Sequence, residues 1–179
     1  PPHSPMIETE RLVLRPWRAD DAPVLYRLAS DSRVSEPAQW PRHTSVGMSR
    51  EVIEKYFIPN PLTFAIVDKD SGQPVGCIGL LPSGDEYFPP LEGEREVGYW
   101  VGRPHWRKGI APEALSALIA YCRDSLHLPY LLLTALATNH PSRRVAAKCG
   151  FSPAGEFSYD GKACLAFRLH LLNANSPGR

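Results

Sequence analysis

The most constraining stretch of the sequence is RPHWRKGIAPEAL, residues 103–115, which lies between two predicted strands. It follows the β-rich run EVGYWV (residues 96–101) and leads into a helix whose apolar side chains recur at helical spacing. The continuously apolar run YLLLTALAT (residues 130–138) then predicts a strand that is buried on both faces. We therefore expect a β-α-β unit in which a basic, glycine-containing turn precedes the helix.

This turn has the features of an anion-binding site. The first N–H groups of a helix have no partner inside the helix, and they lie at the positive end of its dipole. Arg107 and Lys108 add positive charge, Gly109 permits close approach of the backbone, and Ala111 keeps the first turn small. A solvated basic loop is the alternative interpretation. The Walker and dinucleotide glycine patterns are absent, so nucleotide hydrolysis and nicotinamide chemistry are both disfavoured.

The rest of the chain also alternates between strand and helix patterns. Alternating apolar residues predict a first strand at 11–15, and turn residues between β-rich runs predict hairpins. The further expected elements are helices over 20–29 and 48–57, a hairpin over 62–81, a short helix from Pro141 to Gly150, and a closing hairpin over 157–171.

Length and composition indicate one globular domain. The 179 residues are 43% hydrophobic, which is enough for one buried core and short for two. We expect a single domain over residues 7–172, with flexible tails at 1–6 and 173–179. The net charge of +1 argues against a nucleic-acid partner, because such proteins carry broad basic surfaces.

Cysteine and histidine spacing argues against disulfides and metals. The four cysteines lie far apart, and the histidines show no metal-ligand pattern, so we expect reduced thiols and no metal site. The chain shows no signal peptide pattern and no apolar run of the roughly 20 residues that a membrane helix requires. We therefore expect a cytoplasmic protein with no membrane partner.

Several segments together resemble a known family. WRKGIAPEA (residues 106–114) resembles the acyl-CoA pyrophosphate loop of the GNAT (Gcn5-related) N-acetyltransferases, although Trp106 stands where Gln or Arg is commoner. IETERLVLRPWRADD (7–21), VGYWV (97–101) and NHPSRRVAAKCGF (139–151) resemble the RimJ/RimL type, which acetylates ribosomal-protein N-termini. These segments occur in the family's order over nearly the whole chain.

The resemblance implies a fold and a co-substrate. The fold is of the α+β class: a mixed, mostly antiparallel twisted sheet flanked by helices, with parallel central strands that splay apart. Acetyl-CoA is the implied co-substrate, and its pantetheine arm pairs with main-chain groups exposed between those strands. The residues expected to bind it are Tyr99, Trp100, Val101, Arg107, Lys108, Gly109, Ile110, Ala111, Asn139, Ser142 and Arg143.

Acetyl transfer to an amine also requires groups that move protons. We expect Glu96 to be the general base, with Glu92 and Glu94 as rivals, because a protonated amine cannot attack a thioester. The resemblance implies that Ser142 protonates the departing thiolate and that an N–H near Val101 meets the oxyanion. Some of the candidate residues also have a purely structural interpretation. Asn139 or Ser142 could cap the following helix, Arg143 could lie on a solvated helix face, and Glu96 could be an exposed carboxylate at a strand entrance.

The sequence is compatible with more than one class of acceptor. Residues 85–96 carry an excess of acidic side chains that would attract a cationic amine, or that form a solvated loop. We expect direct transfer of acetyl to a primary amine in a ternary complex, the amine belonging to a protein N-terminal residue or to a small molecule. The alternative function is a non-catalytic acyl-CoA-binding or regulatory module. We expect a monomer or a homodimer.

Overall fold

The computed structural model describes residues 5–171, which group into two compact units. The first unit comprises the residues up to Gly79 together with Tyr99–Ala114, and the second comprises Leu80–Gly98 together with the residues from Leu115 onward. The prediction of one domain over 7–172 stays a prediction. The predicted tails lie outside the described residues, apart from positions 5 and 6.

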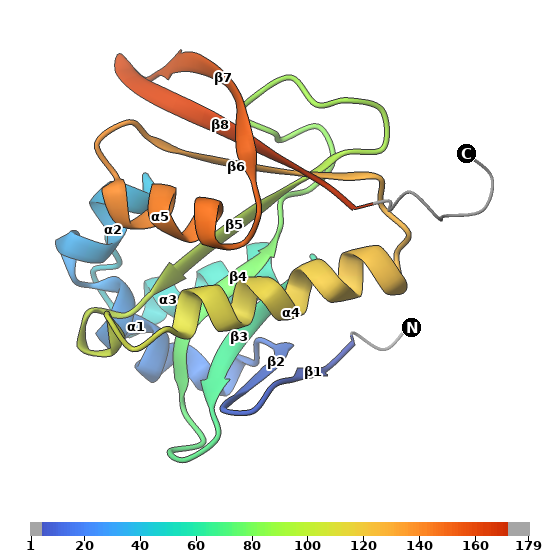
Figure 1. Ribbon diagram of the computed structural model, residues 1–179. Helices are drawn as coiled ribbons and strands as arrows, with labels where there is room; N and C mark the ends of the chain where they lie inside the picture. The colour runs from blue at the N-terminus through green and yellow to red at the C-terminus, as the bar shows by residue number, and fades with distance from the viewer. Residues whose placement is uncertain (1–4, 172–179) are drawn as a thin grey trace. The chain divides into compact units, whose positions relative to one another are not determined.

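The order of elements follows the predicted alternation of strands and helices (Figure 1). The first unit contains β1 (Ile7–Glu8), β2 (Leu12–Pro16), α1 (Ala22–Ala29), α2 (Ser32–Ala38), α3 (Val46–Val52), β3 (Thr63–Asp68) and nearly all of β4 (Pro74–Leu80). The second contains β6 (Tyr130–Leu136), α5 (His140–Lys148), β7 (Ser152–Tyr159) and β8 (Lys162–His170). Two further elements contribute residues to both units, namely β5 (Arg95–Val101) and α4 (Ile110–Asp124).

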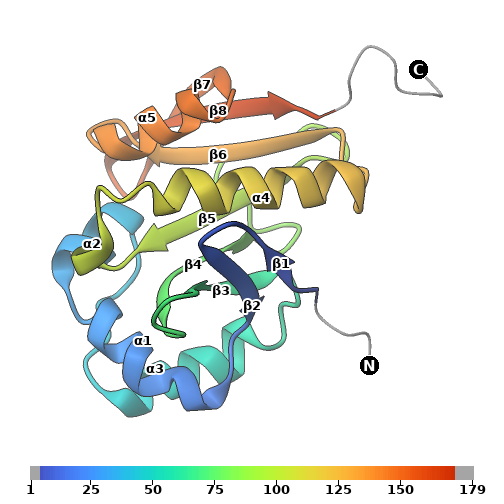
Figure 2. The same cartoon turned by 60° about the horizontal axis from the view of Figure 1, so that its bottom comes forward.

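The sheet of the first unit has the pairing order β1-β2-β3-β4-β5. The strand pairs from β1 to β4 are antiparallel, with Leu14 opposite Ile66 and Ala65 opposite Cys77. Apolar side chains from these strands pack with α1 and with the π turn Ile53–Phe57 that continues α3. In Figure 2 α1 and α3 lie side by side. The core cluster consists of Trp17, Ala22, Leu25, Ala29, Ile53, Ala65, Val67 and Cys77.

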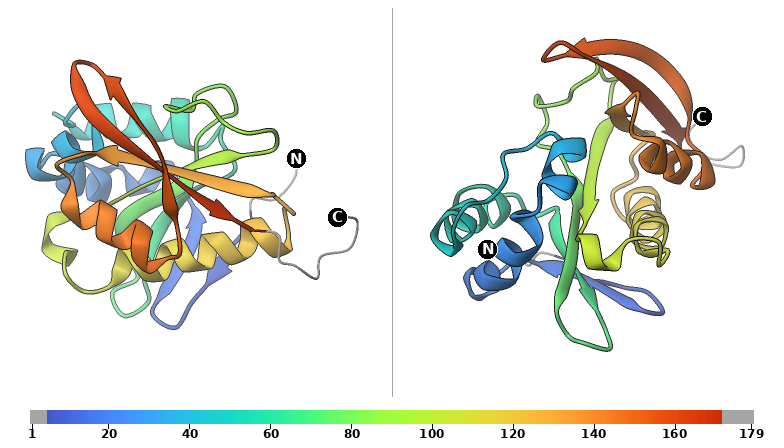
Figure 3. Two further views of the ribbon diagram at one scale, coloured as in Figure 1. Left: turned by 45° about the horizontal axis from the view of Figure 1, so that its top comes forward. Right: turned by 90° about the vertical axis from the view of Figure 1, so that its left-hand side faces the viewer.

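The sheet of the second unit has the pairing order β5-β6-β8-β7. β5 and β6 pair in parallel over Arg95–Val97, whereas β6, β8 and β7 pair antiparallel (Figure 3). Leu131–Leu133 of β6 are all buried, as the continuous apolar run predicts. The mixed, mostly antiparallel sheet is therefore confirmed. None of the helices within residues 5–171 is long and apolar enough to cross a membrane.

The structure adds two elements that periodicity does not predict. α2 lies in a stretch expected to be a loop, and it begins after Asp31, whose carboxylate accepts the N–H of Arg33 at 2.9 Å. The two-residue strand β1 precedes the predicted first strand. α4 ends at Asp124, so Leu126, which continues its apolar stripe in the sequence, lies beyond the helix.

The contact between β4 and the end of β5 depends on a glycine. A Cβ at Gly76 would lie 2.4 Å from the carbonyl oxygen of Trp100, and backbone cannot move aside. We expect Gly76→Ala to lower the free energy of unfolding by about 2 kcal/mol or more. Gly47→Ala in α3 is the matched control and should raise it by about 0.5–1 kcal/mol. Urea denaturation measures both, and equal effects would contradict this packing.

Candidate active site

Glu96 lies on β5, and its carboxylate is held by neutral donors inside the second unit. Only 2% of the residue is exposed. Its Oε1 accepts the N–H of Tyr87 at 2.9 Å, and its Oε2 accepts the hydroxyl of Thr134 at 2.8 Å. Burial raises the pKa of Glu96 to about 7, against the lowering effect of these two hydrogen bonds. A carboxyl with this pKa exchanges its proton near neutral pH, as a general base must.

The two rival carboxylates have different surroundings. Glu94 is buried, and the guanidinium of Arg168 donates to both of its oxygens, at 2.5 and 2.7 Å. The N–H of Leu91 donates to the same carboxylate at 2.9 Å. Glu94 is therefore engaged in an ion pair, and Glu92 has an exposed side chain. Of the three, Glu96 has the environment that suits a base.

An open groove adjoins Glu96. It is lined by Leu81, Pro82, Asp85, Glu86, Tyr87 and Tyr159. The N–H of Leu81 donates to the main-chain carbonyl of Glu96 at 2.8 Å, and the N–H of Tyr87 donates to its carboxylate. The rings of Tyr87 and Tyr159 meet edge to face at 4.9 Å and are 40% and 44% exposed. The groove thus presents aromatic surface and two acids beside the buried carboxyl.

The residues predicted at 139–143 lie at the start of α5. Asn139 is the N-cap, because its Oδ1 accepts the N–H of Ser142 at 3.2 Å. The capping role proposed as an alternative for Asn139 is thus present, and its amide nitrogen is not used by that bond. Arg143 donates to the carbonyl of Ala137 at 3.0 Å, which ties the helix to the preceding turn. Its guanidinium is therefore engaged with the main chain of that turn.

The end of β5 and the turn after it belong to the first unit. Tyr99, Trp100 and Val101 form the last residues of β5. The ring centroids of Trp100 and Trp40 lie 5.3 Å apart, and both side chains pack against the core cluster of the first unit. The indole N–H of Trp106 donates to the carbonyl of Val101 at 2.7 Å. Trp106 thereby folds the turn back onto the strand, a role that the sequence motif does not indicate.

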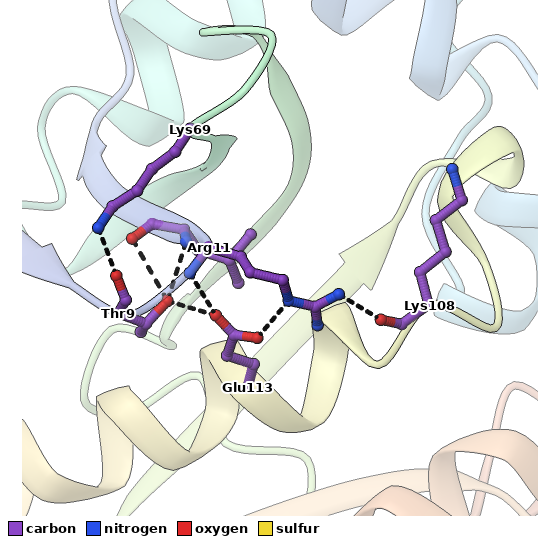
Figure 4. A network of polar contacts seen from close by, with 6 residues as sticks. Thr9, Arg11, Lys69, Lys108 and Glu113 are labelled. Atoms are coloured by element: carbon purple, nitrogen blue, oxygen red, sulfur yellow. Dashed lines mark hydrogen bonds and ion pairs between the residues drawn. The ribbon is translucent and has the colours of Figure 1, made fainter.

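The basic turn has a defined backbone. Arg107 and Gly109 both adopt left-handed conformations, with φ of 62° and 75°. Glycine adopts this conformation readily, whereas arginine does so only where its surroundings impose it. α4 begins at Ile110, which is buried, and Ala111 follows it in the first turn. The carbonyl of Lys108 accepts a hydrogen bond from Arg11 at 2.8 Å (Figure 4).

Several residues around the site were not predicted from the sequence. Thr134 is a hydroxyl-bearing residue within an apolar strand, and that position is a signal for a buried polar contact. Tyr87 acts through its main chain, which carries no sequence signal. Arg11 begins the predicted first strand, and no sequence pattern connects it with the basic turn.

Fold and site together define an acyltransferase class. The sheet has one parallel pair, a basic turn precedes α4, and β5 carries a buried carboxyl whose near-neutral pKa suits proton transfer. Among residues 5–171, no group of three or more His, Cys, Asp and Glu side chains is arranged to hold a metal ion.

Comparison with known proteins identifies the family. The acetyltransferase (GNAT) domain matches residues 11–152. An uncharacterized N-acetyltransferase, p20 of Bacillus licheniformis, is 32% identical over 154 residues, 82% of each chain. The ribosomal-protein-serine acetyltransferase of Escherichia coli K12 is 36% identical over 62 residues, 35% of each chain. The structure of RimL, a ribosomal L7/L12 alpha-N-protein acetyltransferase in complex with coenzyme A, aligns with a TM-score of 0.76 over 93% of this chain and 98% of that one, at 17% identity.

The chain therefore belongs to the GNAT acetyltransferase family, and its activity is acetyl transfer to an amine. Members of this family use acetyl-CoA as the acetyl donor. The expected resemblance to ribosomal-protein acetyltransferases is confirmed.

The hydrogen bond from Thr134 should set the pKa of Glu96. Thr134→Val removes a donor to the ionised carboxylate, so we expect the pKa to rise by about one unit. Thr134→Ser keeps the hydroxyl and should leave the pKa near that of the unmodified protein. Carbon-13 NMR of the Glu96 carboxyl against pH measures it, with exposed Glu51 as internal reference. An unchanged pKa in Thr134→Val would contradict this contact.

Proposed function

We propose that this acetyltransferase transfers acetyl from acetyl-CoA to the N-terminal amine of a protein or peptide, with Glu96 as the general base. The observation that carries the proposal is the position of Glu96. Its carboxyl is buried and has a pKa of about 7, and the N–H of Tyr87 donates to that carboxylate. The N–H of Leu81 donates to the main-chain carbonyl of Glu96, and both donor residues line the open groove. A base so placed can take a proton from an amine that enters through the groove.

The residues of the basic turn fit the diphosphate of coenzyme A. A turn with left-handed Arg107 and Gly109 followed by the first N–H groups of α4 presents donors to an anion, and Lys108 adds charge. We assign the diphosphate to residues 107–111. Main-chain groups of Tyr99, Trp100 and Val101 are assigned to pantetheine, and Val101 contributes its N–H because its carbonyl accepts the indole of Trp106. The further contacts belong to Asn139, Ser142 and Arg143.

The chain's own groups move the protons. Acetyl-CoA supplies the acetyl group as a thioester. An α-amine has a pKa near ~8 and is largely protonated at neutral pH. Glu96 accepts that proton at its carboxylate, and the neutral amine forms the C–N bond as the C–S bond breaks. The proton then lost from the attacking nitrogen passes to the leaving sulfur through the hydroxyl of Ser142, which is regenerated. Burial raises the pKa of both Cys77 and Cys122 to about 12, which makes them poor nucleophiles and favours direct transfer.

The shape and charge of the groove favour a chain end as acceptor. Small molecules usually bind in pockets that enclose most of their surface. This groove is open, with exposed Tyr87 and Tyr159 along it. Asp85 and Glu86 attract a cationic amine and basic residues that follow it. The names of the Escherichia coli relative and of RimL, both acetyltransferases of ribosomal proteins, support the same class. A cytoplasmic location fits four cysteines that form no disulfide.

Thiol release from acetyl-CoA tests this acceptor class. We expect release with peptides that have a free N-terminus and none with the same peptides blocked at that amine. A peptide with lysine after its first residue should have a higher kcat/KM than one with glutamate there. The double variant Asp85→Asn, Glu86→Gln should reduce that ratio severalfold, because it removes the acidic side chains of the groove. Glu51→Gln, an exposed change in the first unit, should not alter it.

Other outcomes would contradict the proposal. Turnover of polyamines or amino acids but of no peptide would assign the groove to a small amine. Saturable binding of coenzyme A without thiol release for any amine would identify a binding or regulatory module. A lysine preference that the double variant leaves intact would remove Asp85 and Glu86 from acceptor selection.

A further inference from the structure

A network of polar contacts connects the β1–β2 turn to the basic turn and the first turn of α4 (Figure 4). Glu113 accepts the Thr9 hydroxyl at 2.5 Å, the Arg11 N–H at 3.0 Å and the Arg11 Nε at 2.7 Å. The Arg11 guanidinium also donates to the carbonyl of Lys108 at 2.8 Å. Lys69 donates to the carbonyl of Thr9 at 2.6 Å. All five residues belong to the first unit.

Arg11 holds both ends of the segment that contains Gly109. Its Nε donates to the carboxylate of Glu113 in α4. Its Nη1 donates to the carbonyl of Lys108, which belongs to the peptide group before Gly109. A trans peptide is planar, and its C=O and N–H point in opposite directions. Because Arg11 holds the carbonyl of Lys108, the N–H of Gly109 in the same peptide is directed away from Arg11. In Figure 4 the Lys108 side chain likewise leads away from the guanidinium.

The charge of Glu113 indicates that this network acts through geometry. A carboxylate in the first turn of α4 would repel an anion bound at the preceding turn. A carboxylate near a helix N-terminus also stabilises the helix, because it interacts favourably with the positive end of the helix dipole. Here, however, Glu113 accepts bonds from Thr9 and Arg11, and its ion pair leaves little net charge beside the turn. Arg11 is consequently poorly suited to supply charge to a ligand and well suited to fix the backbone.

We propose that Arg11 is a positioning residue, which acts through Lys108 and Glu113 to hold the 107–109 turn in the conformation that binds the donor's diphosphate. This inference rests on the proposed assignment of residues 107–111 to that diphosphate. Thr9 and Glu113 complete this network of polar contacts. The left-handed conformation at Arg107 is then maintained by contacts from the β1–β2 segment, which the sequence places about a hundred residues away.

The test compares two acetyl donors in the full chain. Acetyl-CoA carries the diphosphate and S-acetyl-pantetheine does not. We expect Arg11→Gln to raise the KM for acetyl-CoA about five- to tenfold, while kcat and the KM for S-acetyl-pantetheine stay within about twofold. Arg11→Lys should not rescue the KM, because one ammonium cannot reproduce the two bonds of the guanidinium fork. A general loss of folding would affect both donors equally.

Glu113→Ala provides a test of opposite sign. If the network holds the turn, removal of this carboxylate weakens acetyl-CoA binding, and the KM rises as in Arg11→Gln. If only charge matters, removal of a negative group beside an anion site lowers the KM instead. Glu51→Ala is the matched control, because Glu51 forms an exposed ion pair with Lys55 in the same unit. We expect no change there, and Thr9→Val offers a milder variant should the others unfold.

The outcomes separate the two proposals. If the unmodified protein binds both donors equally, the diphosphate assignment of the 107–111 segment fails. If it prefers acetyl-CoA and the Arg11 variants keep that preference, the positioning role of Arg11 fails. A full rescue by Arg11→Lys, or a lower KM in Glu113→Ala, would show a direct charge effect and overturn the inference.

Discussion

The burial of one carboxyl group is the constraint on which the account of this site depends. Glu96 sits between the N–H of Tyr87 and the hydroxyl of Thr134, without the guanidinium that neutralises Glu94. Burial under these conditions favours the protonated form and raises the pKa of Glu96 to about 7. The same main-chain donor, Tyr87, lines the groove, so the loop that shapes the groove also holds the carboxyl of Glu96. The loop that contains Tyr87 therefore contributes both to the surroundings of the Glu96 carboxyl and to the shape of the groove beside it.

Most of the fold follows from apolar periodicity. The buried stripe of α4 and the apolar run of β6 predict their elements because tertiary packing selects the same residues that the pattern singles out. Apolar periodicity does not predict α2, because Val34 is its one large buried side chain and Pro37 lies within it. The helix expected over 20–29 begins as α1 after Asp21, whose carboxylate pairs with buried Arg15, accepts the N–H of Arg18 and does not cap α1.

The site is less predictable, because its contacts join segments that are distant in the sequence. Glu96 can be proposed from its strand, yet the donors that tune it, Thr134 and Tyr87, come from elsewhere in the chain. Arg11 reaches the basic turn from the opposite end of the sequence. The bond from Trp106 to Val101 is local, but a tryptophan in a motif does not reveal its partner. The spacing of residues in the sequence identifies the segments that contain the candidate site residues. Only the folded chain shows which hydrogen-bond donors contact those residues.

The pH dependence of kcat/KM for a peptide acceptor, measured in the unmodified protein and in Glu96→Gln, tests the role of Glu96 most directly. Because the pKa of Glu96 is raised to about 7, its carboxyl is protonated below that pH and becomes able to accept a proton as the pH rises through it. The account predicts a rate limb with an apparent pKa near 7 in the unmodified protein, and its loss, with a much lower plateau, in Glu96→Gln. Identical profiles for the two proteins would show that the base lies elsewhere.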